Sequence, residues 1–269
     1  MGAKMLNKEV AFALCAIKKN IQNSAELRTS FISNIIGMML NNSFFVIIWI
    51  FFVEAVGTIH GWTWIDIVGM QGFGMFSFGV VFTFGAGLIN LPNLVNSGGF
   101  DNMLLSPKNL LLRLSVSAIR ISAIGDLVFG FICLIIFLSI TGVNLYQLIT
   151  FCLVLAVSLT VHLAVMLAVY SLSFFFNDPR AVTIGMFEVF ITPTLFHGGA
   201  IQGTLRVILT FFIPALLIGA LPVEAVRNPS LGILSLMITV SLAWLLFAIK
   251  FFYYCVKRYE SSNFMNFGS

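Results

Sequence analysis

Long apolar runs separated by short polar segments make up most of this chain of 269 residues. A helix needs about 20 apolar residues to cross the hydrocarbon core of a bilayer. Runs of this kind predict six membrane-spanning helices, over residues 31–53, 66–88, 116–140, 145–172, 181–199 and 231–252. The expected fold is therefore an all-α integral membrane protein, with residues 1–269 forming a single transmembrane domain.

The second predicted span is rich in glycine. Gly72, Gly79 and Ala86 recur at heptad spacing and give one face of small side chains. Such a face lets another helix approach closely. The partner of this face could lie within the same subunit or in a second subunit.

Residues 7–28 have the pattern of an amphipathic helix rather than of a span. Leu14 and Ile17 belong to an apolar repeat, and Lys18 and Lys19 add positive charge. A basic amphipathic helix that is not apolar enough to span lies in the membrane interface. This segment is predicted to be an interfacial helix.

Residues 206–227 are apolar enough to cross but contain Pro214 and Pro222. A proline inside a helix removes a backbone hydrogen bond and clashes with the preceding turn. We therefore expect two half-helices that enter and leave the membrane on the same side. In this re-entrant pair, Pro214 and Pro222 would form part of an extracellular gate.

Residues 89–113 form the longest polar interruption of the chain. Within this loop, Phe100–Leu105 predicts one short helix, and a helix that short gains little stability from propensity alone. Its apolar side chains need a surface to cover them, either a groove in a partner protein or the membrane surface. The side chains in question are Phe100, Met103, Leu104 and Leu105, next to Asp101 and Pro107.

Composition and charge support a membrane protein and suggest its orientation. The chain is 59% hydrophobic and 9% charged, against about 25% charged residues in a soluble domain. Given six spans and a re-entrant pair, twelve of the 14 Lys and Arg residues fall on one side. Short loops rich in Lys and Arg stay in the cytoplasm. Both termini are therefore expected in the cytoplasm, and the basic residues reflect membrane topology rather than nucleic-acid binding.

Motifs of enzyme chemistry are missing from the sequence. It contains no G-x-x-x-x-G-K-[ST] phosphate-binding loop, no H-E-x-x-H and no G-x-S-x-G. The four cysteines are scattered without metal-ligand spacing. We therefore predict no catalytic residue, no metal site and no cofactor in this chain.

Four polar residues within the predicted spans are candidates for a transport path. Ionisable groups in a membrane are costly and are usually functional. Asp126 is the deepest acid, although it could instead pair with another residue in the bundle, and His162 is expected to be a hydrogen-bonded core residue. The candidates are Asn41, Asn42, Asp126 and Glu188.

Two stretches resemble those of a known transporter family. Gly99–Pro107 is similar to its G-x-L-D-x-L-L-x-x-P pattern, with Phe100 where Leu is common and Ser106 where a basic residue is common. Phe211–Pro214 together with Leu221–Pro222 is similar to its "ffiP…yP" segment, and Pro193 matches a proline of the preceding span. With this layout, the chain resembles the membrane subunit of ABC-2-type exporters, particularly the six-span bacterial permeases.

The resemblance implies a complex of two membrane subunits with two separate ATP-binding-cassette ATPases, which bind ATP and Mg. It also implies that the loop after the second span docks as a coupling helix in a groove of the ATPase. The coupling residues would be Phe100, Asp101, Met103, Leu104, Leu105 and Pro107. The expected function is export of an amphiphilic or apolar substrate across a bacterial plasma membrane.

Two other functions remain open from the residues. An ion-coupled secondary carrier or channel would use Asp126 and Glu188. A membrane scaffold would hold a cytosolic ATPase without moving any cargo.

Overall fold

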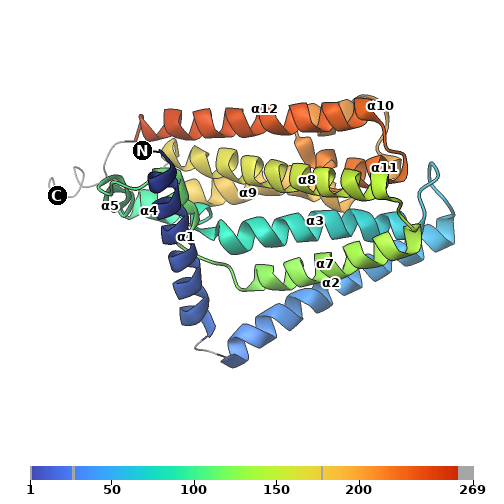
Figure 1. The fold of residues 1–269 in the computed structure, drawn as a ribbon, viewed down its shortest axis with the longest axis horizontal. Coiled ribbons are helices and arrows are strands. Elements are labelled where there is room, and N and C mark those ends of the chain that lie inside the picture. Colours follow the sequence, from blue (N-terminus) through green and yellow to red (C-terminus); the bar gives the residue numbers. More distant parts are fainter. Residues whose placement is uncertain (1, 26–27, 177, 260–269) are drawn as a thin grey trace.

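The computed structural model describes residues 2–25, 28–176 and 178–259, and within these residues the elements are all helices, joined by turns and loops, without a strand. Five described helices have the length and apolar composition of membrane spans. They pack lengthwise into one bundle (Figure 1). These helices are α2 (Arg28–Val56), α3 (Trp64–Phe84), α7 (Ser122–Thr141), α8 (Leu145–Ser171) and α12 (Leu231–Val256).

The tight connection between α7 and α8 is specified locally. Gly142 ends α7 with a φ of 64°, in the left-handed region that favours glycine. Asn144 and Gln147 then form a capping box, in which each backbone N–H donates to the other side chain at 2.9 Å. The chain therefore reverses direction within a few residues.

The predicted spans over 181–199 and 116–140 differ from the structure. In the region of the predicted span over 181–199, α9 (Pro179–Ile191) is a helix of 13 residues. The 3₁₀ turns η3 (Thr192–Leu195) and η4 (Gly198–Ala200) follow it. The region of the predicted span is therefore not one continuous α-helix, because Pro193 cannot extend the α-helical ladder. In the predicted span over 116–140, the helix α7 begins only at Ser122.

Three short helices, not one, occupy the loop after α3. They are α4 (Leu91–Asn96), α5 (Phe100–Leu104) and α6 (Leu110–Ser115). They gather at the end of the bundle where α12 ends, and α1 (Gly2–Ala25) runs across this end instead of along the spans (Figure 1). We call it the α4–α6 end.

Helix α1 is attached to the α4–α6 end through a few contacts. The Asn20 side chain donates to the carbonyl of Val116 at 3.0 Å. Leu14, Lys18 and Lys19 are exposed, and Ile17 is half-buried. Residues 26 and 27 of the predicted interfacial segment lie outside the described residues, and Arg28 already belongs to α2.

The segment predicted as a re-entrant pair, over 206–227, contains two short helices. They are α10 (Gly203–Phe211) and α11 (Ala220–Arg227), joined through the 3₁₀ turn η5 (Pro214–Leu217). Pro214 lies at the break. Pro222 does not break a helix, because it sits in the first turn of α11, where backbone N–H groups need no helical partner.

Ionic contacts fix α10 and α11 at the end of the bundle opposite to α4–α6 (Figure 1). Arg206 of α10 forms an ion pair with Glu224 of α11. Arg227 donates to the buried Asp66 carboxylate at 2.7 Å and to the Gly61 carbonyl at 3.1 Å. The short pair is therefore tied to the first turn of α3.

The glycine face of α3 packs within the subunit. A Cβ added at Gly79 would collide with the backbone of Leu127 in α7, and one at Gly72 would come within 3.0 Å of Leu134. In the same way, a Cβ added at Gly130 of α7 would collide with the backbone of Phe76 in α3. The α3–α7 pair is thus a close-packed unit inside the chain, with Phe73 and Phe137 fully buried beside it.

Candidate functional site: a polar cavity in the bundle

A cavity of about 210 Å³ lies inside the bundle, between α2, α3, α7, α8 and the α9–η3 segment. Its wall is mainly apolar, with Phe45, Met75 and Phe78 among the lining residues. Polar side chains reach it from every one of these elements. They are Asn41, Asn42, Gln71, Asp126, His162 and Thr194.

Asn42 and Asp126 form the central polar contact. The amide of Asn42 in α2 donates to Asp126 Oδ1 in α7 at 2.6 Å, and both residues are buried. A buried carboxylate is tolerated when it is hydrogen-bonded. The Arg120 guanidinium, just before α7, also acts electrostatically on Asp126. The predicted acid is therefore both paired within the bundle and part of the cavity wall.

His162 lies on the α8 side of the cavity. Its Nδ1 is 2.7 Å from Ser77 Oγ, and Ser77 Oγ is 2.6 Å from the Phe73 carbonyl. When the Ser77 hydroxyl donates to that carbonyl, His162 Nδ1 donates to Ser77 in turn. The prediction of a hydrogen-bonded core histidine is confirmed.

Three of the four predicted path residues meet in this cavity, namely Asn41, Asn42 and Asp126. Glu188 does not line it and is exposed on α9. The sequence analysis missed Gln71 and Thr194. The signal for Gln71 was an amide within an otherwise apolar, glycine-rich span, and its Nε2 donates to the Leu195 carbonyl at 3.5 Å.

Phe100 requires a correction. The ring was expected to need a partner's groove, but it is fully buried within the chain. It packs edge-on against Phe174, just after α8, at 5.0 Å between ring centroids, and against Tyr259, just after α12, at 5.1 Å. Phe100 thus anchors α5 to the ends of two membrane-crossing helices.

The other predicted coupling residues face outward to different degrees. Leu104 is 45% exposed and Leu105 is 83% exposed. Pro107 is exposed, whereas Asp101 and Met103 are half-buried. Arg113 steadies this segment, because its guanidinium donates to the carbonyls of Asn102 and Met103 at 3.1 and 3.3 Å.

Tyr259, which packs against Phe100, is also influenced by Asp101 of α5. Its burial, with the Asp101 carboxylate beside it, raises the pKa of the Tyr259 hydroxyl to about 12. The phenol therefore stays neutral throughout the physiological range. The first turn of α5 and the segment after α12 thus share an aromatic contact, and the Asp101 carboxylate acts electrostatically on Tyr259.

A comparison with known families matches residues 35–263 to a model described as ABC-2 family transporter protein. No curated protein sequence gives a significant match. The matched range includes the polar cavity, the short helices α4–α6 and the α10–α11 pair. Since it covers most of the chain, the protein belongs to the ABC-2 transporter family and is a multi-pass membrane permease of an ABC transporter.

Proposed function

We propose that this permease exports an amphiphilic or apolar substrate by using ATP that separate ATPase subunits hydrolyse at the α4–α6 end. The observation that carries the proposal is the exposed Leu104–Leu105 pair at the C-terminal end of α5, a helix whose Phe100 is buried in the bundle. Two adjacent exposed leucines on a water-facing helix suit an apolar groove in a partner. Family membership supports an ABC ATPase as that partner.

The charge distribution supports a cytoplasmic position for the α4–α6 end and for both termini. Lys108, Arg113, Arg180 and Arg258 lie there, outside any ion pair between described residues. At the opposite end, Arg206 and Arg227 are neutralised by Glu224 and Asp66. In a bacterial plasma membrane, the positively charged end faces the cytoplasm. An impermeant thiol reagent should then label Ser230→Cys in intact cells but not Pro107→Cys.

In this proposal α9 continues through η3 as a sixth, irregular crossing. Helices α10 and α11 form the re-entrant pair, with the turn at Pro214 inside the membrane. The Trp244 indole of α12 donates to the Phe211 carbonyl at 2.9 Å, which supports an inward position for this turn. Non-helical backbone at that depth is tolerated where protein covers it, and η5 is buried.

Substrate would pass along the wall that carries Asn41, Asn42 and Asp126. Helix α2 is suited to this role because only 11% of its most apolar window is buried. A second permease subunit could therefore pack against its exposed face, which includes Leu40, Phe44 and Phe51. The polar cavity would then open onto the space between two subunits.

An ion-coupled carrier is less well supported. That function would need both Asp126 and Glu188 on one path, whereas Glu188 is exposed outside the cavity. A membrane scaffold would also bind the ATPase through the α5 surface, but it would transport no substrate. Transport assays with the reconstituted complex separate these functions.

The test is co-purification of the permease with its ATPase from native membranes. We expect Leu104→Ala/Leu105→Ala to abolish ATPase binding while the permease still inserts and folds. Leu145→Ala/Leu231→Ala is the matched control, because these leucines are 74% and 77% exposed at the opposite end. Undiminished ATPase binding by the first variant would exclude α5 as the coupling helix.

A further inference from the structure

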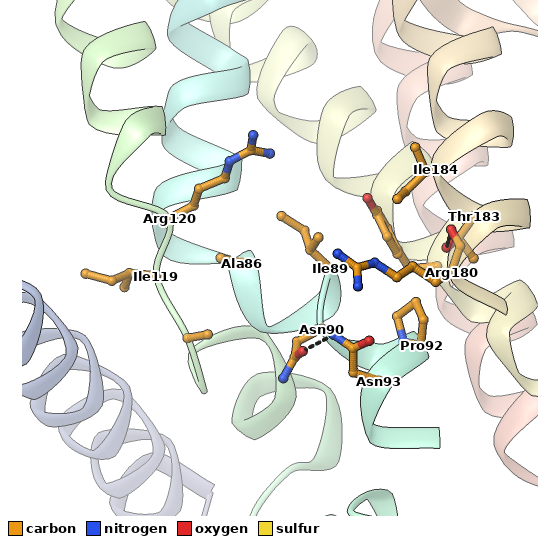
Figure 2. Close-up of a pocket in the computed structure, with 12 residues that line it drawn as sticks. Ala86, Ile89, Asn90, Pro92, Asn93, Ile119, Arg120, Arg180, Thr183 and Ile184 are labelled. Carbon is orange, nitrogen blue, oxygen red and sulfur yellow. Dashed lines mark hydrogen bonds between the residues drawn. The ribbon is translucent and has the colours of Figure 1, made fainter. Parts of the chain in front are cut away.

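A second cavity, of about 320 Å³, lies where several helices begin or end at the α4–α6 side (Figure 2). It is framed by η1 (Ala86–Leu88) after α3, by α4, by the residues just before α7, and by the facing ends of α8 and α9. The long apolar helices α3, α7 and α8 begin or end at this level. In a bilayer that these helices span, the cavity would lie close to the lipid headgroups.

Two arginines dominate its chemistry. Arg120, before α7, and Arg180, in the first turn of α9, lie on opposite walls, and the Arg180 side chain extends towards Ile89 (Figure 2). None of the lining residues is an Asp or Glu. Within the described chain neither guanidinium belongs to an ion pair. The cavity thus holds two positive charges without a carboxylate of its own.

Arg120 is held by contacts that leave it outside any close ion pair of the described residues, although the Asp126 carboxylate in α7 also acts on it electrostatically. Its Nε donates to Ser122 Oγ at 3.1 Å, and its guanidinium lies over the Phe82 ring at 5.9 Å. These contacts orient the group and leave its terminal N–H donors for a ligand. Arg180 is exposed.

The neighbouring side chains complete a mixed polar and apolar surface. Asn90 and Asn93 line the cavity and are joined by a hydrogen bond of 2.8 Å between their side chains. Ile89, Ile119 and Ile184 supply apolar wall beside them. Guanidinium groups bind phosphate through paired N–H donors, and basic pockets between membrane helices accept anionic lipid headgroups.

We propose that the Arg120–Arg180 cavity binds the phosphate headgroup of an anionic amphiphile whose apolar part lies in the adjoining leaflet. Phe82, beneath Arg120, stacks on Phe78 at 3.9 Å between ring centroids, and Phe78 lines the polar cavity. A bound amphiphile would therefore sit one aromatic pair away from that cavity. As a loading position this rests on the proposed export function, but binding itself does not require transport.

The test measures binding directly, with the purified permease in neutral detergent and native mass spectrometry as the readout. The probes are dioleoyl phosphatidylglycerol and dioleoyl phosphatidylcholine, which share acyl chains and differ in net charge. We expect a preference of about tenfold or more for phosphatidylglycerol, because both lipids carry the anionic phosphate but the choline cation of phosphatidylcholine is repelled by the two arginines. Equal binding of the two lipids by the wild type would overturn the proposal.

Variants locate the site. Arg180→Gln and Arg120→Gln should each lower phosphatidylglycerol affinity about tenfold. Arg180→Lys should lower the affinity less, because it keeps the charge but loses the paired N–H donors. Arg258→Gln is the matched control, because Arg258 is exposed at the same end and, among described residues, its side chain is recorded only over the Tyr254 ring, at 5.1 Å. If Arg120→Gln fails to fold, Arg180→Gln decides alone, and unchanged affinity of that variant excludes this cavity.

A competition arm distinguishes an amphiphile from a free anion. Inorganic phosphate at millimolar concentration should leave phosphatidylglycerol bound, because the free ion has no apolar part to share. Displacement by phosphate alone would overturn the amphiphile in favour of a soluble anion. Neither result depends on ATPase binding, so a failure here is distinct from a failure of the export function.

Discussion

The side-chain amide of Asn42 donates a hydrogen bond of 2.6 Å to the carboxylate of Asp126, across 84 positions of sequence and from one membrane-crossing helix to another. Helix α2 is otherwise weakly covered by the rest of the chain. The bond thus joins the most exposed span to the bundle at the wall of the polar cavity. Its loss should affect both stability and transport.

We expect Asn42→Leu to destabilise the permease by about 1–3 kcal/mol, because the buried Asp126 carboxylate loses its donor. The change should appear as a lower melting temperature in detergent. Asn41→Leu is the matched control, because Asn41 lines the same cavity but is exposed. Equal melting temperatures for the two variants would show that the Asn42–Asp126 bond adds nothing to stability.

Phe100 and Leu105 should separate stability from coupling. Phe100→Ala removes a fully buried ring and should cost about 3–5 kcal/mol, measured by thermal unfolding. Leu105→Ala removes an exposed side chain and should leave unfolding within about 0.5 kcal/mol of the wild type. In return, Leu105→Ala should weaken ATPase binding. A stable Phe100→Ala variant that loses only the ATPase would restore Phe100 to the docking surface.

Two glycines of α3 give opposite expectations. Gly79→Ala places a methyl group against the Leu127 backbone of α7 and should destabilise by about 1–3 kcal/mol through overpacking. Gly74→Ala meets no atom within 4 Å and should be neutral or stabilising by up to about 1 kcal/mol, because alanine favours helix. Thermal unfolding in one detergent provides the comparison. Similar losses for both would mean that α3 and α7 are not in close contact at Gly79.

The two ion pairs at the end opposite to α4–α6 should also differ. Arg227→Gln removes the cation from Asp66, which is 1% exposed, and should cost about 1–3 kcal/mol. Arg206→Gln breaks a pair whose partners are both partly exposed and should cost at most about 1 kcal/mol. Raising the salt concentration should weaken the second effect more than the first. The reverse order would indicate that α11 is held mainly by α10.

The helical architecture was predictable because apolar runs and charged flanks carry its signal. Asn42 and Asp126 were also predictable, since polar groups in a membrane span are conspicuous and need partners. The end of α9 was not predicted, although Pro193 marked it. The apolar run continues past this proline, and hydropathy does not record where the backbone ladder stops.

The orientation of Phe100 could not be predicted from the sequence. A helix of five residues is too short for its periodicity to separate an inward from an outward face. Its burial depends on Phe174 and Tyr259, which are distant in sequence and meet it only when α8 and α12 end at the same level. The contacts of Gly72 and Gly79 with α7 were easier to predict. Small residues at heptad spacing predict a close neighbouring helix, although they do not identify it.

The Phe100 anchor determines what a pull on α5 would move. Since its ring is wedged between the segments that follow α8 and α12, a force applied at Leu105 reaches the ends of two long helices at once. These helices are also neighbours along their length, so they would shift together as one stiff unit. Relative motion is then left to the less firmly held α2. A conformational change of the ATPase would then alter the distance between α2 and the rest of the bundle, while α8 and α12 move together.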